Sequence, residues 1–172
     1  MKIDELMFGE SERIPNNPRL PALFYHQAID LANDGAAAIE RLFRANGWGG
    51  LWRNGVFDFQ HYHTKAHEVL AVARGSAKLL IGGPEGRALE VLAGDVIVLP
   101  AGTGHRRIAA SGDFLVVGAY PPGQEPDVQR GPATNADRDA IAAVDLPRLD
   151  PVLGKEGPVV TAWQHAAPSA QG

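Results

Sequence analysis

Three histidines and a glutamate lie at fixed spacings in the segment from Gly55 to His105. Successive side chains of a β-strand point to opposite faces, so His61 and His63 share one face and can reach a single ion. His105 arrives from far along the chain, which requires a second strand to return across the first. The spacing therefore predicts a closed β-structure built around these side chains.

Glu68 completes the set, but it cannot lie on the same straight strand as the histidines. The intervening Thr64-Lys65-Ala66 predicts a bend or bulge, after which the neighbouring run supplies the carboxylate. Imidazole and carboxylate groups together bind hard and borderline divalent metals, so we expect one ion of Fe, Mn, Ni, Co, Cu or Zn with open coordination positions. The candidate ligands are His61, His63, Glu68 and His105.

His67 is the contested position. Residues 61, 63, 65 and 67 share one face if the strand runs straight, and His67 would then compete with Glu68 for the ion. A bulge before Glu68 would shift the alternation by one residue, so that Glu68 instead of His67 shares the face of His61 and His63. We take Glu68 as the ligand, and His67 is then either an outward-facing or supporting histidine or a group for proton transfer.

The rest of residues 51–120 has the pattern of short apolar strands separated by turns. Gly75, Gly94 and Gly102 fit turns that need a positive φ or a close backbone approach. Pro100 fits a strand end, where no ladder donor is lost. Seven short strands at this spacing predict an all-β sandwich or barrel. The candidate strands are Val56–His63, His67–Arg74, Ala77–Ile81, Ala88–Leu92, Asp95–Leu99, His105–Ala109 and Phe114–Ala119.

The first 48 residues are expected to form an N-terminal extension that packs on the barrel. Their apolar run Leu20–Tyr25 predicts an edge strand. Residues 33–45 predict a helix, because apolar side chains recur on one of its faces. Asn33 or Asp34 can cap this helix, and Asn46-Gly47 can end it.

The barrel core is expected to span residues 49–121, and residues 122–172 then form a C-terminal tail. The tail predicts a short helix near Asn135–Val144, followed by Pro-rich extended chain to Trp163. A length of 172 residues fits a single domain made of these three parts.

The histidine-containing segment resembles the paired motifs of the cupin superfamily. In that family, the histidines and the glutamate of the two motifs hold a metal inside a small β-barrel. The resemblance therefore implies a double-stranded β-helix, or jelly-roll, barrel in which the four candidate residues are the ligands. The first motif is carried by Gly55, His61-Tyr62-His63, Glu68 and Gly75, and the second by Gly94, Pro100, Gly102 and His105.

Two details refine the resemblance. The second motif often ends in an Asn where this chain has Ala109, but that Asn is not a ligand, so the metal site does not depend on it. Across the wider chain, His-Tyr-His-Thr-x-x-His-Glu and the later Val-Val-Gly-Ala-Tyr-Pro resemble the YjlB-like bacterial single-domain cupins. That group has no assigned function, so the resemblance implies a fold and a metal without naming a reaction.

Side chains in phase with the ligands are candidates for a substrate pocket. Phe57 and Phe59 share the parity of His61, and they form either core packing or an apolar pocket wall. Leu70 and Val72 share the parity of Glu68 and have the same two interpretations.

Three polar side chains are further candidates for this pocket. Arg107 is in phase with His105, and it either meets an anionic substrate group or lies solvated on the barrel rim. Arg53 and Tyr120 have the same two interpretations.

Charge and composition exclude several classes of function. A net charge of −4 gives no basic face for nucleic acid, and no apolar run is long enough to span a membrane. The start Met1-Lys2-Ile3-Asp4-Glu5 lacks the pattern of a secretory signal, so we expect a cytoplasmic protein. Because the chain has no cysteine, disulfides and thiolate ligands are excluded.

Two functions fit these observations. The first is a metal-dependent enzyme acting on a small organic molecule, of the dioxygenase type or the isomerase or lyase type. The second is a non-catalytic cupin that binds or senses a small molecule. We favour the enzyme, because an intact ligand set with open positions exceeds what ligand storage requires. Exposed edge strands also predict a homodimer.

Overall fold

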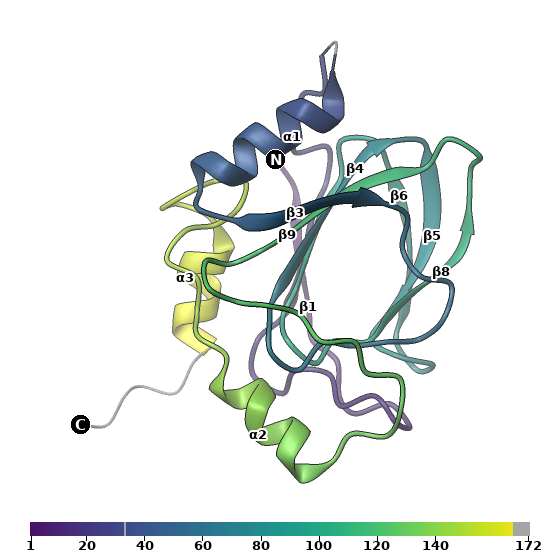
Figure 1. Cartoon of the computed structure of the whole chain (residues 1–172), viewed down its shortest axis with the longest axis vertical. Coiled ribbons are helices and arrows are strands. Elements are labelled where there is room, and N and C mark those ends of the chain that lie inside the picture. The colour runs from purple at the N-terminus through teal and green to yellow at the C-terminus, as the bar shows by residue number, and fades with distance from the viewer. Residues whose placement is uncertain (33, 167–172) are drawn as a thin grey trace.

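The computed structural model describes residues 1–32 and 34–166, and within them nine strands form two antiparallel sheets (Figure 1). The larger sheet has the order β1-β2-β7-β4-β9-β3, and the smaller has the order β6-β5-β8. The two sheets face each other as an all-β barrel, which confirms the predicted fold class. The strands are β1 (Ile3–Leu6), β2 (Ala22–Tyr25), β3 (Gly49–Asn54), β4 (Glu68–Arg74), β5 (Ser76–Ile81), β6 (Arg87–Leu92), β7 (Val96–Leu99), β8 (His105–Ala110) and β9 (Leu115–Tyr120).

Strand β4 lies between β7 and β9 and is buried on both faces. Val69 and Ala71 belong to the apolar cluster outside the barrel, whereas Leu70 and Val72 belong to the cluster inside it. Because both faces are covered, the sequence of β4 is a continuous apolar run instead of an alternating one. Glu68 has the phase of Leu70, so its carboxylate points into the barrel.

Helices α1 (Gly35–Ala45) and α3 (Pro158–Ala166) lie beside the larger sheet, on the side away from the smaller sheet (Figure 1). α1 buries Ile39 and Phe43, and α3 buries Val159 and Trp163, all in the cluster outside the barrel. The chain on both sides of the predicted barrel core therefore covers one face of the barrel wall.

The two predicted helices are present. The side chain of Asp34 caps α1 by accepting a hydrogen bond from the backbone N–H of Ala37, whereas the alternative cap, Asn33, lies outside the described residues. Helix α2 (Asn135–Ala143) begins at a capping box in which Thr134 and Asp137 satisfy each other's backbone N–H groups.

Six of the seven strands predicted within residues 51–120 are present, with their ends within one residue of the prediction. The predicted strand Val56–His63 is wrong, because β3 ends at Asn54 and the following chain is a loop. In that loop the rings of Phe57 and Phe59 stack with centroids 4.7 Å apart. The alternating aromatic residues reflect this local contact and not a strand face.

The predicted edge strand Leu20–Tyr25 is also corrected. Strand β2 is internal, because β1 pairs with one of its sides and β7 with the other. The sequence of β1, Ile-Asp-Glu-Leu, is short and half polar, which is typical of the edge strand that it forms.

The predicted extended chain up to Trp163 is wrong, because residues 158–166 form helix α3. Pro158 is the first helical residue, where its missing N–H costs nothing. The buried carboxylate of Asp150 accepts hydrogen bonds from the backbone N–H of Val159 and from the hydroxyl of Tyr25. This carboxylate joins the start of α3 to strand β2. None of the helices in the described part of the chain is long and apolar enough to cross a membrane.

Candidate metal centre

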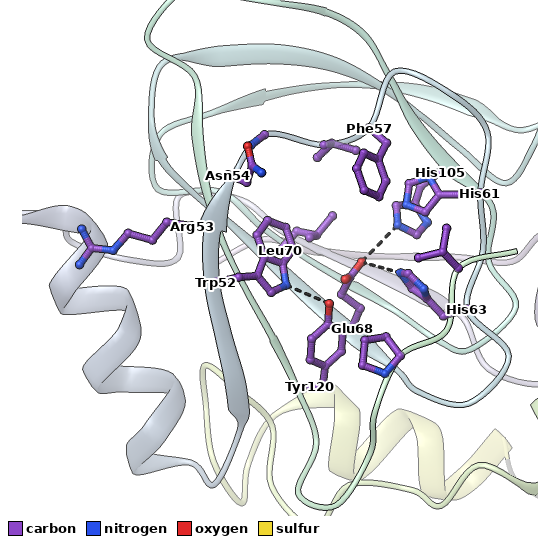
Figure 2. Close-up of a pocket in the computed structure, with 14 residues that line it drawn as sticks. Trp52, Arg53, Asn54, Phe57, His61, His63, Glu68, Leu70, His105 and Tyr120 are labelled. Carbon is purple, nitrogen blue, oxygen red and sulfur yellow. Dashed lines mark hydrogen bonds and ion pairs between the residues drawn. The ribbon is translucent and has the colours of Figure 1, made fainter. Parts of the chain in front are cut away.

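A cavity of about 280 Å³ opens inside the barrel, and the three motif histidines lie at one end of it (Figure 2). The imidazoles of His61, His63 and His105 are buried, and one ring nitrogen from each lies within 4.8 Å of the other two. His105 begins β8 and exchanges two backbone hydrogen bonds with His61. The return of a distant strand across the first motif, expected from the sequence, is therefore present.

The second ring nitrogen of each histidine is held by a backbone carbonyl. Nδ1 of His61 donates to Phe59 over 3.1 Å, and Nδ1 of His105 donates to Thr103 over 3.0 Å. Nδ1 of His63 donates to the carbonyl of Asp127. A carbonyl only accepts hydrogen bonds, so Nδ1 carries the proton and Nε2 keeps its lone pair for a metal.

Glu68 lies against two of these Nε2 atoms (Figure 2). Its Oε1 is 3.4 Å from His63 and 3.2 Å from His105. Burial disfavours the charged carboxylate, but the two imidazoles outweigh burial and lower the pKa of Glu68. The same carboxylate outweighs the burial of His63 and raises its pKa. Burial and the neighbouring His105 lower the pKa of His61 to about 3.

The residues present fit a divalent metal. Nε2 of His63 is buried and has no hydrogen-bond partner among the described residues, although it faces Glu68. This orphaned nitrogen, two further imidazoles and a carboxylate together form a donor set that suits a divalent metal.

A turn in the second motif depends on glycine. Gly102 has φ of +90°, and its N–H donates to the carbonyl of His63 over 2.7 Å. A Cβ at this position would lie 2.7 Å from the carbonyl oxygen of Asn16. Glycine therefore allows the turn before His105 to reach the first motif.

The C-terminal tail supports the first motif through residues 126–129, which we call the strap. The carboxylate of Asp127 accepts hydrogen bonds from the N–H and the hydroxyl of Thr64 and from the N–H of Lys65. Gln129 pairs with Tyr62 through two backbone hydrogen bonds. The sequence predicted only that the tail packs on the barrel, and no motif marked these residues.

Trp52 and Tyr120 form a polar pair beside Glu68 (Figure 2). Nε1 of Trp52 donates to the hydroxyl of Tyr120 over 2.9 Å. The indole lies so close to Gly118 that a Cβ there would be 2.1 Å from it, which requires glycine. Burial and the charge of Glu68 raise the pKa of Tyr120, so its phenol stays protonated.

The structure brings only some of the predicted pocket residues to the cavity. Phe57, Leu70 and Tyr120 line it. Val72 packs in the apolar cluster inside the barrel, and Phe59 lies under the guanidinium of Arg130, which is 3.8 Å from its ring centroid.

The two arginine candidates lie differently with respect to the cavity. Arg107 is partly exposed and is not among the lining residues. Arg53 does line the cavity, but its guanidinium forms an ion pair with Glu40 and points away from the histidines (Figure 2).

His67 is buried away from the cavity, on the face of the sheet that meets α3. Its ring centroid is 4.9 Å from that of Trp163, and its Nδ1 accepts a hydrogen bond from Ala101 over 2.9 Å. Burial lowers the pKa of His67 to about 4. The phase of Val69 explains this position, because His67 and Val69 share the outer face of the sheet.

Comparison with known proteins gives a family model that matches the barrel region and a relative that matches most of the chain. A family model described as Cupin matches residues 53–129. The uncharacterized protein YjlB of Bacillus subtilis (strain 168) is 38% identical over 159 residues, which cover 91% of this chain and 93% of that protein.

Solved structures that resemble this one do so at low identity. An acireductone dioxygenase from Bacillus anthracis, with cadmium in its active centre, has 18% identity and a TM-score of 0.38, and the match covers 53% of this chain and 62% of that chain. An 11S globulin from Wrightia tinctoria has 16% identity and a TM-score of 0.38, covering 46% and 22% of the two chains. The matched part therefore spans less than two thirds of either protein.

Proposed function

The chain belongs to the cupin family, within the group of the YjlB protein, and on this premise we propose that it is a metal-dependent enzyme acting on a small organic molecule. The observation that carries the proposal is the orientation of three imidazoles. Each Nδ1 is committed to a carbonyl, so the three Nε2 lone pairs are free for one divalent ion beside the carboxylate of Glu68. His61, His63, Glu68 and His105 would hold that ion.

A bound divalent ion supplies Lewis acidity at the inner end of the cavity, and a redox-active metal adds the capacity for dioxygen chemistry. The residues of the chain do the rest. Glu68 supplies a buried negative charge, and the protonated phenol of Tyr120 holds a proton at Oη close to it. Trp52 and Leu70 line the cavity and keep water from its inner end.

Activity is proposed to be of the dioxygenase type or the isomerase or lyase type, because both need a small molecule bound at open metal positions. A role as a binding or sensing protein is the alternative. Protein that retains a ligand without converting it, whichever divalent metal is loaded, would favour that alternative.

We further propose that the protein is cytoplasmic and forms a homodimer. Strands β1 and β3 are the two outer strands of the larger sheet, and each leaves one side for pairing with a second copy. Light scattering on the purified protein measures the molecular mass.

The metal proposal is tested by removing two ligands at once. Protein made in metal-replete medium is expected to hold close to one divalent ion per chain, and the variant His61→Ala/His105→Ala is expected to hold almost none. Elemental analysis measures both. The matched control, His26→Ala/His165→Ala, removes two histidines outside the cavity and should match wild type. Equal metal in the ligand variant and wild type would contradict the assignment.

A further inference from the structure

The cavity has one polar end and a mostly apolar lining beyond it. The histidines, Glu68 and Tyr120 form the polar end. Beyond them, Trp52, Val56, Leu70 and Pro126 form the apolar part of the walls, and Arg53, Asn54 and Gly55 also line the cavity. A ligand that fills this space therefore meets mainly polar groups at the histidine end and mainly apolar side chains beyond it.

Two apolar side chains at the cavity are half exposed. Phe57 lies in the loop after β3 and is 49% exposed, and Val128 lies in the strap and is 50% exposed. We call these two residues the lip. They come from separate segments of the chain, yet both line the same cavity. Large exposed apolar side chains around a cavity are typical of a surface that a ligand covers.

The lining offers little to a polyanion or a sugar. Among the described residues that line the cavity, Arg53 is the sole lysine or arginine, and its guanidinium pairs with Glu40. Nε1 of Trp52 is committed to Tyr120, and the side-chain oxygen of Asn54 accepts from Gly55. A phosphate or a row of hydroxyls along these walls would lose water and gain few partners.

We propose that the ligand of this cavity is amphipathic. It has one compact oxygen-bearing head, neutral or singly charged, and an aliphatic or aromatic body that runs along the walls to the lip. The inference about the head rests on the proposed metal function, because the head would bind at the metal. The inference about the body does not, because the body contacts side chains of the protein. A cavity of about 280 Å³ is at the lower end of ligand pockets, so a longer body reaches Phe57 and Val128 at the surface.

Alkyl hydroxamates of increasing length test this ligand class, because each carries the same two-oxygen head. Binding of acetohydroxamate, butanohydroxamate, hexanohydroxamate and octanohydroxamate to the cobalt-loaded protein is measured by calorimetry. Affinity is expected to rise roughly fourfold for each added methylene that becomes buried. Phosphonoacetate, a small polyanion, should bind more weakly than octanohydroxamate.

Variants of the lip connect the effect of chain length to named residues. Phe57→Ser and Val128→Thr should each weaken octanohydroxamate binding about tenfold and acetohydroxamate binding much less. Val128→Thr keeps the side-chain shape and should fold normally. It therefore still tests the lip if Phe57→Ser folds poorly. The control, Ile108→Ser, changes an exposed apolar residue outside the cavity and should have no effect.

The metal-free protein separates this inference from the proposed function. It should show the same gain per methylene at lower overall affinity, because the walls do not depend on the ion. If the protein binds no metal but its affinity still rises with each methylene, the metal function is contradicted and the amphipathic ligand is supported. Equal affinity along the series, or tighter binding of phosphonoacetate, would overturn the inference. So would lip variants that alter only the oligomeric state, because the lip would then be an interface between copies.

Discussion

At the scale of single residues, the candidate site depends on the tautomer of each histidine. Three carbonyls fix the proton on Nδ1 and leave each Nε2 with its lone pair, and those of His63 and His105 face Glu68. The sequence predicted which residues meet, because His61 and His63 are close in the chain and the motif spacing is specific. It could not predict the carbonyl of Asp127, which comes from the tail and carries no side-chain signature.

His67 is a structural histidine with a measurable acid dependence. Its pKa is about 4 in the folded protein and about 6.5 in an unfolded chain, so between these values only the unfolded state binds the proton. Stability is therefore lost as the pH falls through this window, by up to roughly 3 kcal/mol from this residue. We expect His67→Gln to lose less stability than wild type between pH 6.5 and pH 4.

Urea unfolding of the metal-free protein across that range measures the difference. Glutamine can still accept the hydrogen bond from Ala101, which limits the cost at neutral pH. The exposed His165 provides the control, because His165→Gln should keep the wild-type dependence. An unchanged loss in His67→Gln would show that this imidazole is not kept neutral by burial.

At the scale of elements, the strap connects the tail to the metal centre. Pro126 and Val128 line the cavity, whereas Asp127 between them turns back to Thr64 and Lys65. One short segment thus supplies a cavity wall, a carbonyl for His63 and an anchor for the first motif.

Removing the anchor should weaken metal binding without removing a ligand. Asp127→Ala loses charge-assisted hydrogen bonds to Thr64 and Lys65, so the carbonyl that orients His63 is no longer held. We expect zinc affinity to fall about 10- to 100-fold, as is typical when a group behind a metal ligand is lost. Competition with a chromophoric chelator measures it. Asp139→Ala, at an exposed position of α2, is the control, and equal affinities in wild type and Asp127→Ala would refute the role of the strap.

Elements were predictable where one physical signal acted alone. Strands β4 to β9 follow from apolar runs bounded by turn residues, and α1 follows from its apolar face. The prediction of a strand at Val56–His63 was wrong, because the alternating aromatic residues Phe57 and Phe59 stack on each other in a loop. Helix α3 was not predicted, because Pro158 suggests extended chain. In the structure, the carboxylate of Asp150 satisfies a backbone N–H at the start of the helix.

At the scale of the whole molecule, one sheet separates two apolar clusters. The cluster inside the barrel holds the smaller sheet against the larger one, and the cluster outside holds α1 and α3. Glu68 and His67 are neighbours in the chain but lie on opposite sides of this sheet. The alternation of side chains along β4 therefore decides which of the two residues faces the histidines. Glu68 faces the cavity, and His67 faces α3.

The cavity walls were the least predictable part of the molecule. They come from β3, β4, β9, the loop after β3 and the strap, which are far apart in sequence. Leu70 was found by its phase with Glu68. The phase argument for Phe57 assumed a strand that is absent, and Pro126 and Val128 have no phase relation to a ligand. Only the assembled fold brings these segments around one space.

The central claim is that three Nε2 atoms and the carboxylate of Glu68 bind one ion. A crystal of the zinc-loaded protein, measured on both sides of the zinc absorption edge, locates the metal directly. We predict a single anomalous peak in the cavity at about 2.0–2.2 Å from Nε2 of the three histidines and from Glu68. A peak on His67 or on any Nδ1, or fully loaded protein with no peak in the cavity, would contradict the account.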